Sequence, residues 1–322
     1  MRYYMAFDGG GTKLQGILFD EDCRLLSSAR TEGVNTTVRS REQAEENVRA
    51  CIRALLEQAG REIPAIALAV STEPHLYEEQ LRRFLPCGGS MTAGEGGVGV
   101  LACGETDGIC ALSGTGSDIF YVEDGRETDV LGGWGHLLDD DGSGVWIGRR
   151  AVRSMMRCLE GIQEPGLLHD LLRERHGLTG RDAVYRAVYH TQAPAFFLGS
   201  CCRTVNEAAA QGDPTALEIL RRGGALLAGE ALAMLKKHQA GPGLAVCTTG
   251  SVFRHCVPLR ERFFEVLGAE RPDLRSCRPL FEPVVGALIS CMRRLGRDSS
   301  PELLRSLRQE YAEFVIPEGW SA

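Results

Sequence analysis

The sequence predicts an α/β fold made of two related lobes, and three observations support this. The apolar run 2–7 leads into a glycine-rich stretch and a second apolar run at 14–19, which is the pattern of a hairpin with a glycine tip. The same order of strand, small-residue tip, strand and acidic turn recurs about a hundred residues later, around 113–117. Short apolar strands alternate with helical patterns after the first hairpin. A repeat of this size favours two lobes that each offer one loop to a shared ligand.

Length and composition set the class of protein. The chain has 322 residues, of which 43% are hydrophobic and 25% charged, so it is an ordinary globular sequence long enough for about two domains. We predict a first lobe over 1–107 and a second over 108–322, whose last helix can return to the first. The net charge of −7 argues against a nucleic-acid partner, which would need a basic face. No apolar run approaches the ~20 residues of a membrane span.

Twelve cysteines raise the question of a metal site or disulfides. There is no C-x-x-C pair, and several cysteines lie inside apolar runs. No signal peptide precedes the first strand. We therefore expect buried, reduced thiols in a cytoplasmic protein.

The first glycine tip has the chemistry of a phosphate-binding turn. Gly10 and Gly11 lack a Cβ, so backbone N–H groups can approach an anionic oxygen, and Thr12 adds a hydroxyl donor. Asp8 would face the metal ion that accompanies the phosphates. Glycine tips are often only turns, and this one is neither a Walker A loop nor a G-x-G-x-x-G opening a helix. Its recurrence favours two loops that clamp a triphosphate from both sides.

The remaining elements of the first lobe follow in order. The segment 23–31 completes a three-stranded meander, and Ser40 with Gln43 is the signature of a capping box. The helix that begins there has one apolar face and ends at Gly60. A buried strand at 66–70, a helix at 77–85, a strand at 90–92 and a helical start at 98–103 follow. This order is typical of an α/β lobe.

Glu95 stands between glycines after the last of these strands. Open α/β sheets usually bind ligands at the carboxyl ends of their strands, so Glu95 is a candidate site residue. An acid that is favoured by the helix dipole at a helix N-terminus would occupy the same position. The residues alone leave both readings open.

A second unusual stretch covers 131–148. Its Gly-Gly-Trp-Gly turn brings backbone groups close to a ligand, and the indole of Trp134 offers a face that suits a sugar ring. Asp140 could accept hydrogen bonds from hydroxyls. Alternatively, the three acids at 139–141 simply cap the helix over 144–158.

These motifs resemble those of a known family. The segments 8–12, 112–117, 132–136 and 140–143, followed by Trp146 and Ile147, resemble the N-acetylglucosamine kinase family, in the BadF/BadG/BcrA/BcrD-type branch of the actin, hexokinase and heat-shock chaperone ATPase superfamily. The resemblance covers nearly the whole chain. The segments 206–214, 249–252 and 284–288 are similar to the family's adenine segment, adenosine loop and terminal helix. The resemblance implies two ribonuclease H-like, actin-like lobes with a nucleotide cleft between them.

The resemblance also implies site residues, with ATP and Mg²⁺ as cofactors. Nucleotide-binding residues would be Asp8 (also on the metal), Gly10, Gly11, Thr12, Lys13, Gly114, Thr115, Gly116, Ala208, Gly250 and Ser251. Sugar-binding residues would be Asn35, Thr36, Gly133, Trp134, Gly135 and Asp140. The family's catalytic base is an aspartate, and counting back from Ser113 places Glu95 there. Glu95 is therefore a departure, and Asp118, in place of a polar amide, is another.

The reaction implied is phosphoryl transfer from ATP to a hydroxyl of a small-molecule amino sugar, with Glu95 as the base. Two alternatives stay open. One is an ATPase activator of the same branch, which carries an iron–sulfur cluster between two subunits. The other is a sugar-binding regulator without catalysis, although no DNA-binding head precedes the first strand. Homodimers are common among the relatives, so a homodimer is compatible with the resemblance.

Overall fold

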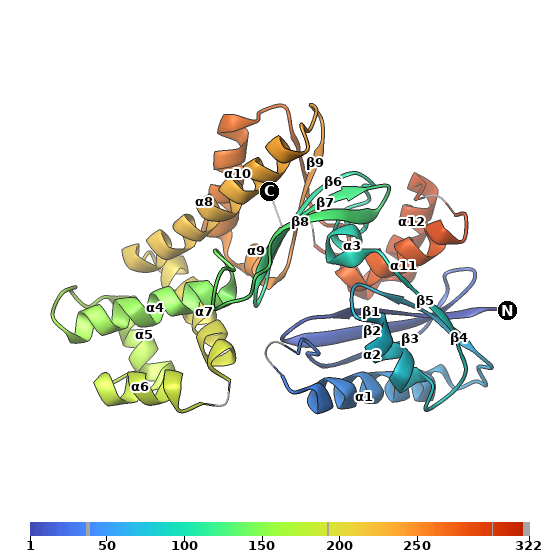
Figure 1. The fold of residues 1–322 in the computed structure, drawn as a ribbon, viewed down its shortest axis with the longest axis horizontal. Coiled ribbons are helices and arrows are strands. Elements are labelled where there is room, and N and C mark those ends of the chain that lie inside the picture. Colours follow the sequence, from blue (N-terminus) through green and yellow to red (C-terminus); the bar gives the residue numbers. More distant parts are fainter. Residues whose placement is uncertain (37–38, 192, 298, 318–322) are drawn as a thin grey trace.

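The computed structural model describes residues 1–36, 39–191, 193–297 and 299–317, and Figure 1 shows two lobes, each built on a mixed sheet. The first sheet has the strand order β3-β2-β1-β4-β5. Its strands are β1 (Tyr3–Gly9), β2 (Lys13–Asp20), β3 (Leu25–Glu32), β4 (Ile66–Val70) and β5 (Cys87–Thr92). The first three strands form an antiparallel meander, and β4 and β5 are parallel to β1.

The second sheet repeats this topology with the order β10-β9-β6-β7-β8. Its strands are β6 (Gly108–Ser113), β7 (Ser117–Glu123), β8 (Arg126–Gly132), β9 (Ala245–Thr249) and β10 (Arg275–Cys277). Again three strands form an antiparallel meander, and two further strands extend the sheet in parallel from its first strand. The predicted α/β fold of two related lobes is confirmed.

Two helices cover the outer face of the first sheet, α1 (Arg41–Ala59) and α2 (Pro74–Leu81). The capping box is present, since the Ser40 hydroxyl accepts from the Gln43 N–H and the Gln43 side chain accepts from the Ser40 N–H. The predicted helix at 77–85 is wrong in its bounds. It starts earlier because Pro74 has the φ of a first helical residue and needs no N–H partner there. The strand predicted at 90–92 begins earlier, at Cys87.

The inner face of the first sheet packs against α3 (Gly94–Ala102), which directly follows this sheet in the chain, and against helices near the C-terminal end. The latter are α11 (Pro283–Arg294), α12 (Pro301–Glu310) and the short 3-10 helix Ala312–Phe314. Apolar side chains of β1 and β2, such as Tyr4 and Ile17, share one core with Val284 and Leu288 of α11. The chain thus comes back to its first sheet after completing the second.

Helix α3 joins the lobes. Val98 and Leu101 face α11, whereas Val100 packs against the second sheet. The contacts on both sides are close. A Cβ added at Gly96 would lie 2.2 Å from the Cβ of Phe120, and one at Gly286 would lie 2.1 Å from the Val98 carbonyl oxygen. The glycines of α3 therefore allow backbone to pack directly against both neighbours.

The other face of the second sheet supports the largest core. The helices around it are α4 (Gly144–Leu159), α5 (Leu167–His176), α6 (Arg181–Tyr189), α7 (Pro194–Ala210), α8 (Pro214–Lys237), α9 (Ser251–His255) and α10 (Val257–Glu270). In Figure 1, α4 to α7 extend away from the sheet. All twelve cysteines are free thiols. Within the described ranges, no helix is long and apolar enough to cross a bilayer.

Candidate functional site

The glycine tips of the two lobes meet. The first tip (residues 10–12) joins β1 to β2, and the second tip (residues 114–116) joins β6 to β7. A Cβ added at Gly11 would lie 2.8 Å from the Thr115 hydroxyl oxygen, so the tips face each other at close range. A Cβ at Gly10 or Gly114 would find no heavy atom within 4 Å. The space beside these two glycines is therefore open to a ligand.

The first tip is held by the loop that follows β3. The N–H groups of Val34 and Asn35 donate to the Gly10 carbonyl at 2.9 and 3.3 Å, and the Gly10 N–H donates to Lys13. Both Asn35 and its neighbour Thr36 are exposed. This loop therefore brings the two predicted sugar-binding residues next to the first tip.

The second tip is held by two segments that are distant in sequence. The Ser113 hydroxyl donates to the Gly142 carbonyl at 2.9 Å, and the Gly144 N–H at the start of α4 donates to the Gly114 carbonyl at 2.8 Å. Gly250 has a φ of 97°, and a Cβ there would lie 2.2 Å from the Ser113 carbonyl oxygen. Gly250 and Ser251 therefore lie beside the second tip.

The residues at the tips fit the phosphates of a nucleotide. In the part of the chain that the structure describes, the N–H groups of Gly11, Thr12 and Thr115 have no acceptor. The Thr12 side chain is exposed. Free amides and hydroxyls beside open space are the donors that phosphate oxygens need.

Asp8 is the penultimate residue of β1, two positions before the first tip. The pKa of its carboxyl is raised to about 6, mainly by burial, with Lys13 acting to lower it and the Glu282 carboxylate to raise it. Lys13 pairs with Glu282 at 2.9 Å, and Arg254 of α9 also donates to Glu282. A buried carboxylate beside phosphate donors has the chemistry of a Mg²⁺ ligand. The sequence reading missed Glu282, which connects the β2 strand of the first lobe to α9 of the second.

Glu95 lies in the first turn of α3, directly after β5. Glu95 therefore has the position of an acid favoured by the helix dipole, which is one of the two interpretations of this residue from the sequence. It is also close to acids of both lobes. Burial, together with the negative charges of Asp118, Asp8 and Glu127, raises the pKa of Glu95 to about 8. A carboxyl of the first lobe therefore faces the junction between the lobes.

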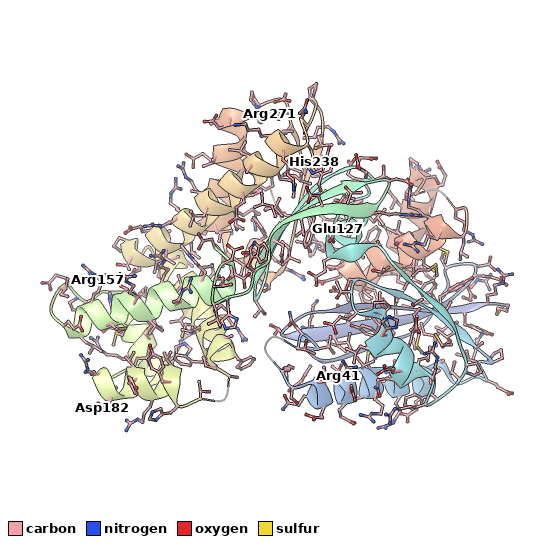
Figure 2. All side chains as sticks on the ribbon, in the orientation of Figure 1. Arg41, Glu127, Arg157, Asp182, His238 and Arg271 are labelled. Atoms are coloured by element: carbon pink, nitrogen blue, oxygen red, sulfur yellow. The ribbon has the colours of Figure 1, made fainter. Side chains whose placement is uncertain are left out.

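Glu127 of β8 fixes the start of α3 from the opposite lobe. Its carboxylate accepts the Gly96 N–H at 3.2 Å, and its own N–H donates to the Ala93 carbonyl at 3.0 Å. Figure 2 labels Glu127 beside α3. These bonds bracket Glu95 and restrict its position. No sequence pattern indicates this contact, because a glutamate on a polar strand resembles any solvated residue.

Asp140 lies beside the second tip, since a Cβ added at Gly116 would lie 3.0 Å from its carboxylate oxygen. Burial raises the pKa of Asp140, the nearby backbone N–H groups of Ser117 and Gly135 lower it, and only 7% of the residue is exposed. The reading in which the acids cap α4 is wrong for Asp140, because the cap is Ser143, whose hydroxyl accepts from the Trp146 N–H at 3.1 Å.

Asp118 lies between the Gly-Gly-Trp-Gly turn and Glu95. A Cβ added at Gly133 would lie 2.0 Å from a carboxylate oxygen of Asp118. Burial, together with the negative charges of Asp140 and Glu127, raises the pKa of Asp118 to about 7. Trp134 is 76% exposed, so its indole is free to contact a ligand.

Ala208 is not brought to the tips. It lies in α7, and its side chain is completely buried in the core of the second lobe. Its contact with adenine stays a prediction.

Comparison with known proteins assigns the family. The model of the BadF/BadG/BcrA/BcrD ATPase family matches residues 7–290. The chain belongs to this family. An N-acetylmuramic acid/N-acetylglucosamine kinase of Clostridium acetobutylicum is 24% identical over 304 residues, which cover 90% of this chain and 98% of the relative. A glucosamine kinase of Vibrio cholerae is 25% identical over 270 residues, or 78% of this chain and 85% of the relative. Membership in an ATPase family implies that the chain binds ATP.

Solved structures agree on the fold. A Chromobacterium violaceum protein assigned by inference as an N-acetylglucosamine kinase superposes with a TM-score of 0.69 at 24% identity, covering 90% of this chain and 99% of that one. A glucokinase of Streptomyces griseus, solved with glucose and an ATP analogue, superposes with a TM-score of 0.56 at 18% identity. The match covers 88% of this chain and 97% of the glucokinase chain. The two lobes therefore have the actin-like ATPase fold.

Proposed function

We propose that this protein transfers the terminal phosphoryl group of ATP to a hydroxyl of an amino sugar, either N-acetylglucosamine-like or glucosamine/N-acetylmuramate-like. The observation that carries the proposal is the meeting of the two tips at Gly11 and Thr115, with the Glu95 carboxyl at the same junction. The two curated relatives named above act on amino sugars, which supports this acceptor class.

The two tips would hold the phosphates. Thr12 and Thr115 would donate hydroxyl and amide hydrogen bonds to phosphate oxygens, and Gly10 and Gly114 leave the space for them. Asp8 would hold Mg²⁺ through its carboxylate. Bound ATP and Mg²⁺ supply the transferable phosphoryl group and the charge that offsets its oxygens. Lys13, paired with Glu282, would contribute positive charge beside the same loop.

Gly250 and Ser251 would flank the adenosine, because they lie beside the second tip. Gly116 would complete the second tip; a Cβ at this glycine would lie 3.0 Å from a carboxylate oxygen of Asp140. The nucleotide would therefore contact both lobes at once.

Glu95 would accept the proton of the attacking hydroxyl. A general base works best when its pKa is close to the working pH, and the raised pKa of about 8 makes this carboxylate a stronger base than an ordinary one. Below that pH the carboxyl is mostly protonated and cannot accept a proton. The rate should therefore rise with pH through the neutral range.

The sugar would lie between the loop after β3 and the Gly-Gly-Trp-Gly turn. Asn35 and Thr36 approach from the first lobe, whereas Gly133, Trp134 and Gly135 approach from the second. Asp140 would accept a hydrogen bond from a sugar hydroxyl through its carboxylate, which lies beside Gly116 of the second tip. A sugar held this way would present its primary hydroxyl to Glu95.

An ADP-release assay with a panel of sugars tests the proposal. N-acetylglucosamine, glucosamine, N-acetylmuramic acid and glucose are compared in the wild-type protein and the Glu95→Gln variant, with Glu62→Gln as an exposed control. We expect turnover that depends on an amino sugar, at least about a hundredfold less in Glu95→Gln, and normal in Glu62→Gln. ATP hydrolysis that no sugar stimulates would reject the kinase and favour an ATPase activator.

A further inference from the structure

A cavity with four arginines in its lining lies on the second lobe between α4 and α8. Its volume is about 260 Å³. Arg150, Arg153 and Arg157 line it from α4, and Arg222 lines it from α8. The three arginines of α4 are spaced so that they share one face of the helix. Figure 2 shows Arg157 toward the end of α4 that is remote from the first lobe.

Within the described ranges of the chain, the guanidinium groups of this pocket are not paired with carboxylates. Among the described residues, none of the four guanidinium groups forms an ion pair or a hydrogen bond. By contrast, Arg221 on the neighbouring position of α8 pairs with Glu265 at 3.1 Å. A single acid, Glu218, lines the cavity.

The positive charges converge on Arg150. Burial lowers the pKa of its guanidinium, and the positive charge of Arg222 lowers it further, with a smaller contribution from Arg153. The charge of Asp141 acts in the opposite direction. Arginines that disfavour one another's charge at close range would be stabilised by an anion between them.

A second, independent feature of the pocket is the indole of Trp146. Trp146 lines the cavity and is 1% exposed. The Cζ atom of Arg150 lies over its ring, 4.8 Å from the ring centroid. The indole N–H is buried and has no acceptor in the part of the chain that the structure describes. A buried N–H without a partner is costly and rare in native proteins. An acceptor atom in the cavity would remove this cost.

The wall beside the indole is polar and ordered by its own hydrogen bonds. The Ser154 hydroxyl donates to the Gln163 side chain at 3.1 Å, and the Gln163 amide donates to the Thr215 hydroxyl at 3.2 Å. Both hydroxyl-bearing side chains line the cavity. The pocket therefore combines cationic forks with a preformed polar wall, which is a built site rather than a solvated helix face.

We propose that this pocket binds a small phosphate-bearing anion, with its oxygens between the arginines and the Trp146 N–H. Phosphate fits better than a single carboxylate, because it offers more acceptor oxygens to several guanidinium forks. The volume suits a small molecule rather than a macromolecule. The site is separate from the two tips and does not depend on the proposed kinase reaction.

Isothermal titration calorimetry tests the site with three probes: orthophosphate, pyrophosphate and glucosamine 6-phosphate. The variants are Arg222→Gln and Arg153→Gln, both at exposed positions, and the matched control is Arg221→Gln, one residue along α8. We expect at least one probe to bind, with affinity reduced about tenfold or more in the two pocket variants and unchanged in the control. Tighter binding of glucosamine 6-phosphate assigns a phosphate ester as the ligand, and tighter binding of pyrophosphate assigns an inorganic one.

Two results would overturn the proposal. One is the absence of binding for all three probes. The other is equal affinity in Arg222→Gln and Arg221→Gln, since an anion bound at the two tips would be insensitive to both. If Arg222→Gln proves unstable by circular dichroism, Arg157→Gln, also exposed, replaces it in the same comparison.

Discussion

Replacing Glu95 by glutamine should remove activity and stabilise the fold at alkaline pH. The pKa of Glu95 is raised from 4.5 to about 8 by burial and by the neighbouring carboxylates. A carboxyl with a raised folded-state pKa holds its proton more tightly when folded. Its protonated form therefore stabilises the fold fully below pH 4.5, and that contribution is lost as pH rises through 8. Glutamine has the same shape and no charge, so it avoids the loss.

The size of the effect follows from the same pKa. Each unit of pKa shift corresponds to about 1.4 kcal/mol, so the ionised Glu95 carboxylate can destabilise the fold by at most about 5 kcal/mol at pH 8 and above. Several carboxylates share the repulsion and solvent screens part of it, so we expect roughly 1–3 kcal/mol. For a chain of this size that corresponds to a melting temperature about 2–4 °C higher than that of the wild-type protein.

Thermal unfolding at pH 5 and at pH 8.5 checks this prediction. The melting temperatures of Glu95→Gln and wild type should nearly coincide at pH 5 and separate at pH 8.5, while the exposed control Glu62→Gln follows wild type at both. A Glu95→Gln variant that is less stable than wild type at pH 8.5 would refute the reasoning, because it would mean that the ionised carboxylate makes favourable contacts.

Three further substitutions have expected outcomes. Asp118→Asn removes a negative charge that raises the pKa of Glu95, so the acid limb of the pH–rate profile should move down by roughly 0.5–1 pH unit; a limb that stays in place excludes this coupling. Glu127→Ala removes an acceptor for the Gly96 N–H, so kcat should fall about tenfold and the free energy of unfolding by about 1 kcal/mol. Glu127→Gln should restore most of both. Equal kcat in the wild-type protein and the two variants contradicts a positioning role. Gly250→Ala places a Cβ against the Ser113 carbonyl at a residue with positive φ. The free energy of unfolding measured in urea should therefore fall by at least about 2 kcal/mol, and ATP should bind more weakly. Unchanged stability and ATP affinity would show that this contact is not important for either.

Local signals predicted much of the fold. The capping box at Ser40 and Gln43 placed the start of α1, and the continuous apolar run predicted β4 with its observed bounds, Ile66–Val70. The two glycine-tipped hairpins were visible as a repeated pattern, because strand, tip and strand are adjacent in sequence. Pattern reasoning works where the interactions that form an element lie within it.

Long-range contacts account for what the sequence did not predict. Glu127 caps α3 from a strand of the other lobe, and Glu282 joins Lys13 to Arg254 across both lobes. No spacing in the chain relates these residues, so only the folded structure brings them together. The same holds for the glycines of α3. Gly96, for example, is explained by the close approach of Phe120, which leaves no room for a Cβ at this position.

The identity of the phosphorylated product tests the central claim most directly. ³¹P nuclear magnetic resonance of a reaction containing ATP, Mg²⁺ and the best amino sugar follows each phosphorus atom. We expect a sugar phosphate ester that grows in step with ADP in the wild-type protein and is absent in Glu95→Gln. ADP that appears together with inorganic phosphate alone would show that water, not a sugar hydroxyl, receives the phosphoryl group, and would contradict the account.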